Sequence, residues 1–267
     1  MTPAPSRSGS PGPSPAGTAP VCALIADIVG SRRLEDRAGA QRTFLEVLEA
    51  AGEGLALLEP ARATVGDEFQ AVAAGLAPAL EFTLRACLLL PEGLRLRFGL
   101  GIGEVREVDP SAADVVQDGS AWWAAREAID AAHELQDSGR EFALTRIRVA
   151  PERAAALDGT EPGIQPGVEA LTNAMLLLRD QAVCRLQARQ RRVIGALLLG
   201  RTQVDVAREE RLSQQAVSAL ARGAGAGILA AQEHLRAVHD AAAAERRDAP
   251  TGGGSAVKRS TADQEEA

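Results

Sequence analysis

Regular structure is first indicated at residue 21, where a polar stretch gives way to apolar residues. The run 21–26 is continuously apolar, which is typical of a strand that is covered on both faces. A second strand pattern lies at 94–103, where apolar side chains alternate with arginines and glycines. Three of the glycines, Gly99, Gly101 and Gly103, share one face, so we expect either a helix or a ligand to approach the backbone closely there.

The segments between these strands alternate between helical and strand patterns. Their apolar spacing predicts helices at about 35–55, 77–90 and 119–135, a hairpin at 62–73 that turns at Gly66-Asp67, and a strand at 141–149. The resulting order β-α-β-β-α-β-α-β is the split βαβ pattern of a ferredoxin-like sheet, extended by one αβ unit. We therefore predict an α+β fold with the helices on one face of the sheet, followed by an all-α domain.

Composition changes mark the limits of these parts. Residues 1–20 are rich in proline, serine and glycine, and the last residues are rich in glycine and charge, which is typical of disordered tails. After Pro151 the pattern is entirely helical. The predicted organisation is a tail at 1–20, a sheet domain at 21–150, a helical linker at 151–180, a helix-turn-helix domain at 181–243 and a tail at 244–267.

Charge and cysteine usage exclude several classes of protein. The 267 residues carry a net charge of −7, so any DNA contact must come from a local basic patch. The three cysteines lack the spacing of a zinc site. No apolar run approaches the ~18 residues of a membrane span. We therefore expect a cytoplasmic protein that makes no membrane contact.

Acidic residues mark the best candidate for a site in the sheet domain. Asp27 ends the first strand and Asp67 lies on the hairpin turn, and in a split βαβ sheet these two elements are neighbours. Two facing carboxylates repel each other, which makes Mg²⁺ or Mn²⁺ the natural partner, with room left for phosphate. In the alternative interpretation Asp67 is an ordinary solvated residue of the turn, and Asp27 caps the segment that follows it.

Four segments of the chain resemble known proteins. They are "ADIVGS" (26–31), "TVGDEFQAV" (64–72), "RFGLGIGEV" (97–105) and "GSAWWAAREA" (119–128). In this order they resemble the metal-binding strand, the metal-bearing hairpin, the glycine-rich strand and the arginine-bearing helix of class III nucleotidyl cyclases. The hairpin is also similar to the GGDEF turn of diguanylate cyclases. The combination with a helical C-terminal part resembles the SatD family of bacterial proteins.

The resemblance to cyclases implies roles for particular residues. Asp27, Asp67 and the carbonyl of Ile28 would hold the metal, and Arg126 would stabilise charge on the transferring phosphoryl group. The residues expected at a bound nucleotide are Arg62, Gly99, Gly101 and Trp122, and further candidates for lining the site are Gln70, Arg32 and Arg33. Cyclase-like sheets work as dimers, so the resemblance also implies a homodimer.

Two polar contacts of the cyclases are missing from this chain. The position of the purine-selecting lysine holds Ala63, next to Arg62, and the position of the ribose-orienting asparagine holds Trp122. Loss of orienting groups typically costs orders of magnitude in rate, so a degenerate site is predicted and its nucleotide is not specified. Trp122 is expected either to stack on a base or to pack in a core or a subunit interface.

The C-terminal segment has the pattern of a helix-turn-helix and resembles region 4 of sigma factors. Thr202 and Ser213 are the expected N-caps of two short helices, of which 213–222 would be the recognition helix. The core expected between the helices consists of Val204, Ala207, Leu212, Val217 and Leu220.

DNA binding is expected from this pair of helices, because glutamine amides read adenine in the major groove. The residues expected at DNA are Arg201, Gln214, Gln215, Ser218 and Arg222, with Arg185, Arg189, Arg191 and Arg192 extending the basic patch. The alternative is a helical hairpin used for dimerisation, since Glu209 and Glu210 would repel phosphate.

Three hypotheses of function follow from these patterns. The leading one is a SatD-like regulatory protein, in which a degenerate cyclase-like domain binds a metal or nucleotide and the helix-turn-helix binds DNA. The first alternative is an active nucleotidyl cyclase or a related metal-dependent enzyme acting on nucleoside triphosphates. The second is a dimeric scaffold that does not bind DNA.

Overall fold

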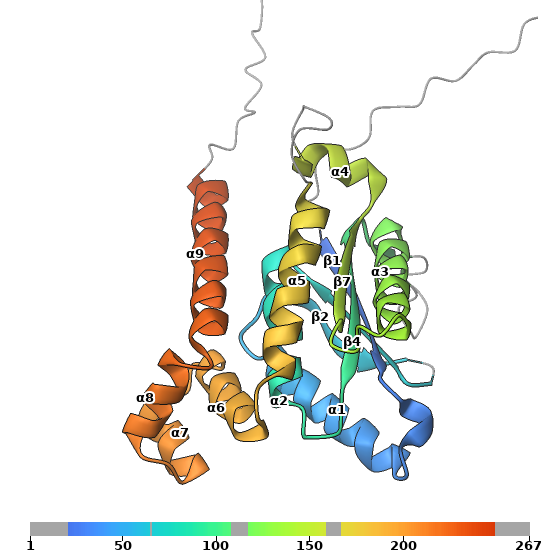
Figure 1. The fold of residues 1–267 in the computed structure, drawn as a ribbon. Coiled ribbons are helices and arrows are strands. Elements are labelled where there is room, and N and C mark those ends of the chain that lie inside the picture. Colours follow the sequence, from blue (N-terminus) through green and yellow to red (C-terminus); the bar gives the residue numbers. More distant parts are fainter. Residues whose placement is uncertain (1–20, 65, 108–116, 159–166, 249–267) are drawn as a thin grey trace, which may run out of the picture.

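The fold is a mixed α+β architecture built on a five-stranded sheet (Figure 1). The computed structural model describes residues 21–64, 66–107, 117–158 and 167–248. The expected tail at 1–20 and residues 249–267 of the expected C-terminal tail lie outside these ranges. Residues 244–248 belong instead to the last helix, α9 (Ala226–Asp248).

The sheet has the strand order β2-β3-β1-β4-β7. Its strands are β1 (Val21–Ile28), β2 (Leu57–Ala63), β3 (Glu68–Ala73), β4 (Leu96–Gly103) and β7 (Thr145–Val149). The central strand β1 is antiparallel to both β3 and β4, β2 is antiparallel to β3, and β7 is parallel to β4. The short strands β5 (Arg106–Glu107) and β6 (Gln117–Asp118) pair separately. Strands from distant parts of the chain are therefore neighbours.

Helices cover both faces of the sheet, so the prediction of helices on one face is wrong. On one face α1 (Arg37–Gly52) and α2 (Leu76–Leu89) pack over Leu24 and Ala26, whereas α3 (Ser120–Asp137) packs over Ala23 and Ile25 on the other (Figure 1). The physical reason is that β1 and β4 are buried along almost their whole length. A strand that is apolar on both faces needs a cover on both.

The glycine face of β4 accommodates helix α3. A Cβ atom on Gly101 would lie 2.0 Å from the carbonyl oxygen of Ala121, and one on Gly99 would lie 2.1 Å from that of Ala125. Of the two alternatives, a helix or a ligand, the structure shows the helix. The backbone of Gly99 and Gly101 is therefore not available to a nucleotide, which corrects the expectation for these two residues.

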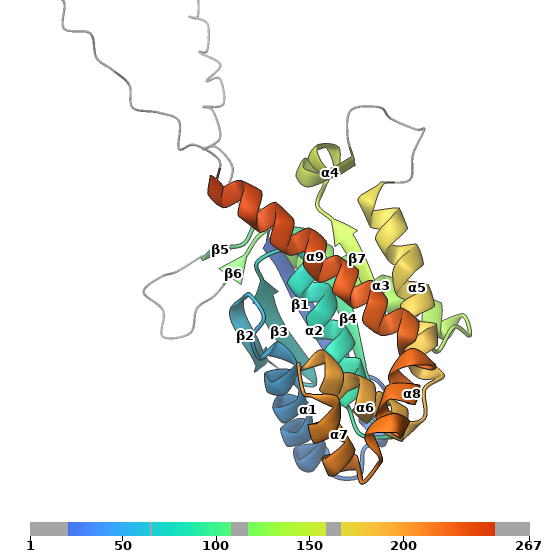
Figure 2. The same ribbon diagram turned by 90° about the vertical axis from the view of Figure 1, so that its left-hand side faces the viewer.

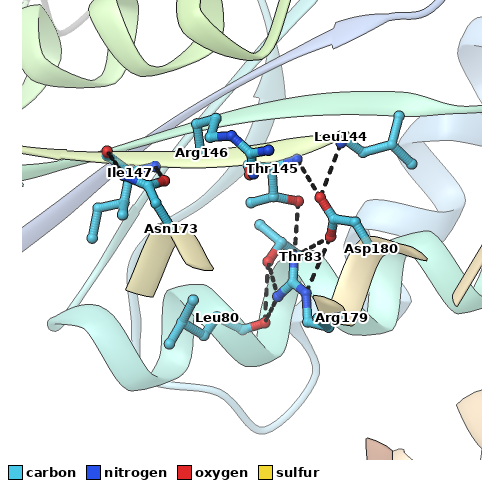
Figure 3. Close-up of polar contacts among 9 residues, drawn as sticks. All are labelled: Leu80, Thr83, Leu144, Thr145, Arg146, Ile147, Asn173, Arg179 and Asp180. Carbon is cyan, nitrogen blue, oxygen red and sulfur yellow. Dashed lines mark hydrogen bonds and ion pairs between the residues drawn. The ribbon is translucent and has the colours of Figure 1, made fainter. Parts of the chain in front are cut away.

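Helix α5 (Val168–Cys184) covers the edge of the sheet at β7 and is not a linker. The Asn173 amide accepts from the Ile147 N–H at 3.0 Å and donates to the Ile147 carbonyl at 3.0 Å, as a neighbouring strand would (Figure 3). Asp180 accepts from the N–H groups of Leu144 and Thr145 at 2.9 and 2.7 Å. The predicted linker at 151–180 thus begins with α4 (Pro151–Asp158) and ends within α5, the helix that covers the edge of the sheet.

Arg179 ties this edge to the neighbouring helix. Its guanidinium donates to the carbonyl of Leu80 and the hydroxyl of Thr83 on α2, both at 3.1 Å, and to the hydroxyl of Thr145 on β7 at 2.8 Å (Figure 3). It also pairs with Asp180. One side chain therefore joins α2, α5 and the edge strand.

The remaining helices are α6 (Ala188–Leu198), α7 (Gln203–Glu210), α8 (Gln214–Arg222) and α9, which crosses over α2 in Figure 2. Helices α6 and α9 pack against α2 and extend the main core, whereas α7 and α8 pack against α6. Ile194, Leu198 and Ile228 belong to the same apolar cluster as the sheet residues. Within the described residues no helix is long and apolar enough to cross a membrane.

Candidate functional site

Asp27 lies in a row of charges that crosses three strands. The alternation along β1 directs its side chain toward the face covered by α3, and its cross-strand neighbours are Glu68 on β3 and Arg97 on β4. Two carboxylates and one guanidinium therefore stand side by side at one end of the sheet. We refer to Glu68, Asp27 and Arg97 as the charge row.

Arg97 is the cation that partners Asp27. Its Nη1 atom lies 3.0 and 3.3 Å from the two carboxylate oxygens of Asp27, and its Nε donates to Gln136 of α3 at 2.9 Å. Burial raises the pKa of Asp27, the positive charge of Arg97 opposes this rise, and the negative charge of Asp67 adds to it. The pKa of Asp27 lies above its ordinary value as a result.

Sequence reasoning missed Arg97 and Gln136. The available signal was the alternation at 94–103, which places Arg97 on the same face as the glycines. The register with β1 is a tertiary property, however, and only that register puts Arg97 beside Asp27.

Arg126 is held by the other end of the charge row. It forms an ion pair with Glu68 at 2.7 Å, and Gln70 donates to the second oxygen of Glu68 at 3.0 Å. The hydrogen bond to Glu68 raises the pKa of Arg126. The structure thus brings Arg126 to the same end of the sheet as Asp27, with a carboxylate as its partner.

Asp67 is exposed at the tip of the hairpin, after Gly66 with φ of +83°. It lines a cavity of about 380 Å³ together with Ile28, Arg32 and Arg37. Two guanidiniums beside a carboxylate make this cavity polar at its mouth. Arg32, one of the residues expected to line the site, therefore lines this cavity.

The expected metal ligands do not form a ready cation site. Both oxygens of Asp27 are within hydrogen-bond distance of Arg97. Among the described residues no group of three or more histidine, cysteine, aspartate or glutamate side chains is placed to hold a metal ion. A divalent cation at Asp27 and the Ile28 carbonyl would have to compete with the guanidinium, so these residues do not fit a resident metal.

The two tryptophans of α3 differ in their surroundings. Trp122 is 9% exposed and packs against Ala23, Ile25 and Val72, whereas Trp123 is 66% exposed. The core alternative therefore holds for Trp122, and its side chain is not open for stacking on a base. Arg62 is exposed on β2 and is paired in register with Gln70, on the face of the charge row.

Comparison with known protein families shows to which family the chain belongs. The sequence model of the SatD family matches residues 21–159, which is more than half of the chain. This protein belongs to the SatD family. No curated protein sequence matches the chain. The SatD match contains the sheet, the charge row and α3, and it ends before α5.

The helices beyond the SatD match contain a compact pair, α7 and α8. The hydroxyls of Thr202 and Ser213 accept from the N–H groups of Asp205 and Ala216 at 3.2 and 3.1 Å. Both expected N-caps are therefore confirmed. Between the helices Arg211 has a left-handed conformation with φ of 54°, which makes the turn sharp.

The small core of these helices differs from the predicted one at Val204. That side chain is 50% exposed, and Val206 and Val193 are fully buried beside Ala207 and Val217. The helix begins at Gln203, which turns Val206 and Ala207 inward. Leu212 and Leu220 pack against this core as expected.

Acidic residues neutralise part of the expected basic patch. Glu210 accepts from Arg192 at 2.8 and 2.7 Å, and Glu209 pairs with Arg201. The hydrogen bond from Arg192 holds the pKa of Glu210 below its ordinary value. Arg201 is thus paired with a carboxylate, and the sequence alone did not predict this pairing.

The first residues of α8 are open to solvent. Gln214 and Gln215 are exposed, Ser218 is half-buried, and Arg222 at the end of the helix is exposed. Arg211, just before the Ser213 cap, is exposed as well and was not identified from the sequence. These side chains form one end and one flank of a surface helix.

Proposed function

We propose that this SatD-family protein is a non-catalytic regulator that contacts DNA through α8. The observation that carries the proposal is the surface position of Gln214 and Gln215 on a capped helix above a closed apolar core. This arrangement suits a recognition helix of a DNA-binding protein. The N-terminal residues of such a helix reach the edges of the bases, while the preceding helix crosses the DNA backbone.

The sheet is proposed to be ferredoxin-like and related to nucleotidyl cyclases. The strand order supports this, because β3 lies between β1 and β2, and β1 lies between β3 and β4. This is the order expected of two interlocked split βαβ units. The added pair of α3 and β7 extends the sheet by one strand beyond β4.

The charge row supports the loss of catalysis. Arg97 takes the position beside Asp27 that a metal would need, and Glu68 holds Arg126. Ala63 and Trp122 stand where cyclases have their orienting lysine and asparagine. We propose that the charge row serves stability and, through the nearby cavity at Asp67, the binding of an anion or nucleotide.

The DNA proposal is tested by selecting bound sequences from a random DNA pool. With a selected site, Gln215→Ala should lower discrimination at one base pair by about 1–3 kcal/mol. Arg222→Ala should weaken all sequences equally and reduce the salt slope by about 1. Arg42→Ala, at an exposed position of α1, is the matched control and should change neither.

A pool without enrichment, bound with an affinity that does not depend on salt, would refute DNA binding. The scaffold alternative would then remain, and sedimentation would report the proposed homodimer. The exposed side chains of Trp123 and Leu58 are the large apolar groups of the sheet domain from which such an interface would draw.

The enzyme alternative is favoured by one observation, the cavity where Arg32 and Arg37 flank Asp67. Incubation with ATP or GTP and Mg²⁺ or Mn²⁺ tests it. We expect no cyclic product. Cyclic product that disappears in Asp27→Asn would establish catalysis. A rise in melting temperature with Mg²⁺ alone, lost in Asp67→Asn, would establish the metal site.

A further inference from the structure

A second cavity lies where the sheet layer joins the C-terminal helices. Its volume is about 300 Å³, and it is lined by the end of α2, the segment that leads into β4, and the link between α5 and α6. A cavity of this size is at the lower end of the range for small-molecule sites.

Two arginines at this cavity have no acidic partner in the described structure. Neither Arg95 nor Arg191 forms an ion pair with a described residue, and the Nε atom of Arg191 is buried without a hydrogen-bond acceptor there. The one acidic side chain in the lining is that of Glu92, which is exposed. A buried donor without an acceptor is costly, so the cavity is chemically incomplete toward an anion.

Both guanidiniums lie close enough to the thiol of Cys184 to affect its ionisation. Partial burial and the negative charge of Asp180 raise the pKa of Cys184, and the positive charges of Arg95 and Arg191 oppose the rise. Both arginines and Cys184 line the cavity. Two positive charges therefore lie in the lining of this cavity.

The floor of the cavity is apolar. Leu90, Leu96, Leu144 and Val183 line it, and each of these except Leu144 belongs to the main core cluster. An anion that is fully hydrated would gain nothing from this floor. A ligand with one charged end and one apolar end would satisfy both parts of the lining.

We propose that this cavity binds a small amphiphilic anion, whose carboxylate or phosphate pairs with Arg95 and Arg191 and whose apolar part packs on the half-buried side chains of Leu94 and Leu186. Such a ligand would touch the segment that leads into β4 and the start of α6, the helix that supports α7 and α8. Binding would stabilise the junction between the two parts of the chain. A metabolite of this kind would therefore control the position of the C-terminal helices.

Alkylation of Cys184 by iodoacetamide provides the test, because Cys184 is exposed whereas Cys22 and Cys87 are buried. The probes are octanoate, octan-1-ol and inorganic phosphate, added to the full-length chain. At octanoate concentrations about nine times its Kd, mass action should slow alkylation about tenfold. Octan-1-ol and phosphate, which each carry half of the required chemistry, should slow it much less.

The variant Arg95→Gln/Arg191→Gln should lose the protection by octanoate. The matched control is Arg185→Gln, which removes a charge next to Cys184 but outside the cavity lining, and it should keep the protection. Melting temperatures without ligand check folding, and the single exchange Arg95→Gln, at an exposed side chain, serves if the double variant is unstable. Equal protection by octanoate and octan-1-ol, unchanged protection in the arginine variants, or no protection by octanoate would overturn the proposal.

Discussion

Arg97 and Arg146 are buried arginines on neighbouring strands, 6% and 4% exposed, with different surroundings. Arg97 has the carboxylate of Asp27 and the amide of Gln136. Among the described residues Arg146 donates to the carbonyl of Thr145, and its Nη2 atom has no acceptor. Burial lowers the pKa of Arg146, and the charge of Asp180 opposes this effect. The two side chains should therefore respond in opposite ways to substitution.

Arg146→Met should raise the free energy of unfolding by about 1–2 kcal/mol, because it removes a buried guanidinium that has no carboxylate in contact. The comparison is Arg97→Met, which leaves the carboxylate of Asp27 without its cation and should lower the free energy of unfolding by about 3–5 kcal/mol. Urea unfolding measures both. A loss of stability in Arg146→Met would mean that its guanidinium has a stabilising partner.

Gly101 offers a second test at the residue scale. Gly101→Ala places a methyl group 2.0 Å from the carbonyl of Ala121 on α3, so the helix must move away from the sheet. We expect a loss of about 3 kcal/mol or more in the free energy of unfolding. Gly227→Ala, in helix α9 with open space around the new methyl group, should instead be neutral or stabilise by up to about 1 kcal/mol. Equal effects would contradict the close approach of α3.

At the scale of elements, polar side chains position two helices on the sheet layer. Helix α5 covers the edge of β7 through Asn173 and Asp180, which replace the hydrogen bonds of a missing strand and leave no open edge there. Helix α9 is fixed on α2 through Glu81, which accepts from Gln232 at 2.9 Å and from Arg236 at 2.8 Å. Both contacts join residues that are far apart in sequence.

The contact at Glu81 predicts a dependence on pH. Burial would raise the pKa of Glu81, but hydrogen bonds and charge from Arg236 and Arg85 outweigh it and hold this pKa below its ordinary value. The stabilisation is therefore complete above the ordinary glutamate pKa of 4.5 and is lost as pH falls through the folded pKa. Hydrogen exchange in α9 should accelerate in that acid range.

Glu81→Gln should lower the free energy of unfolding at neutral pH by about 2–3 kcal/mol and abolish this acid sensitivity of α9. Glu233→Gln on the exposed side of the same helix is the control and should change the free energy of unfolding by less than about 0.5 kcal/mol. Acid sensitivity that persists in Glu81→Gln would assign it to another group.

At the scale of the whole molecule, helices α6 and α9 share the main core with the sheet layer, whereas α7 and α8 close a small core of their own. Ile194, Leu198 and Ile228 pack in the same cluster as the strands and α2. Helices α6 and α9 therefore join the two parts of the chain by packing, and the division into a sheet domain and a helix-turn-helix domain stays a prediction. Helix α2 contacts both α6 and α9 and so carries much of this junction.

A chain that ends at residue 185 should consequently be unstable. It loses the three apolar side chains of α6 and α9 from the core, each contributing about 1.5–3 kcal/mol, so the free energy of unfolding should fall by roughly 5 kcal/mol or more. Thermal unfolding measures this fall. The control is a chain that ends at residue 248, which keeps α9 and should melt like the full chain. Equal melting temperatures for all three would show that the helices fold separately.

The sequence by itself determined the elements and their caps. The apolar run at 21–26, the alternation at 94–103 and the caps at Thr202 and Ser213 are local patterns, and local backbone preferences suffice to interpret them. The resemblance to the SatD family depended on short motifs of the same kind, and the SatD match bears out that part of it. Asp27 and Arg126 were singled out from the sequence, but their partners Arg97 and Glu68 were not.

Only the tertiary structure decided which groups meet. The pairing of Asp27 with Arg97 depends on strand register, the pairing of Arg192 with Glu210 on the packing of α7 against α6, and the cover on the glycine face on the position of α3. Each joins side chains whose separation along the chain says nothing about their distance. Electrostatic and packing energies depend on that distance, so the state of the charge row, the place of α5 and the shared core followed from the fold alone.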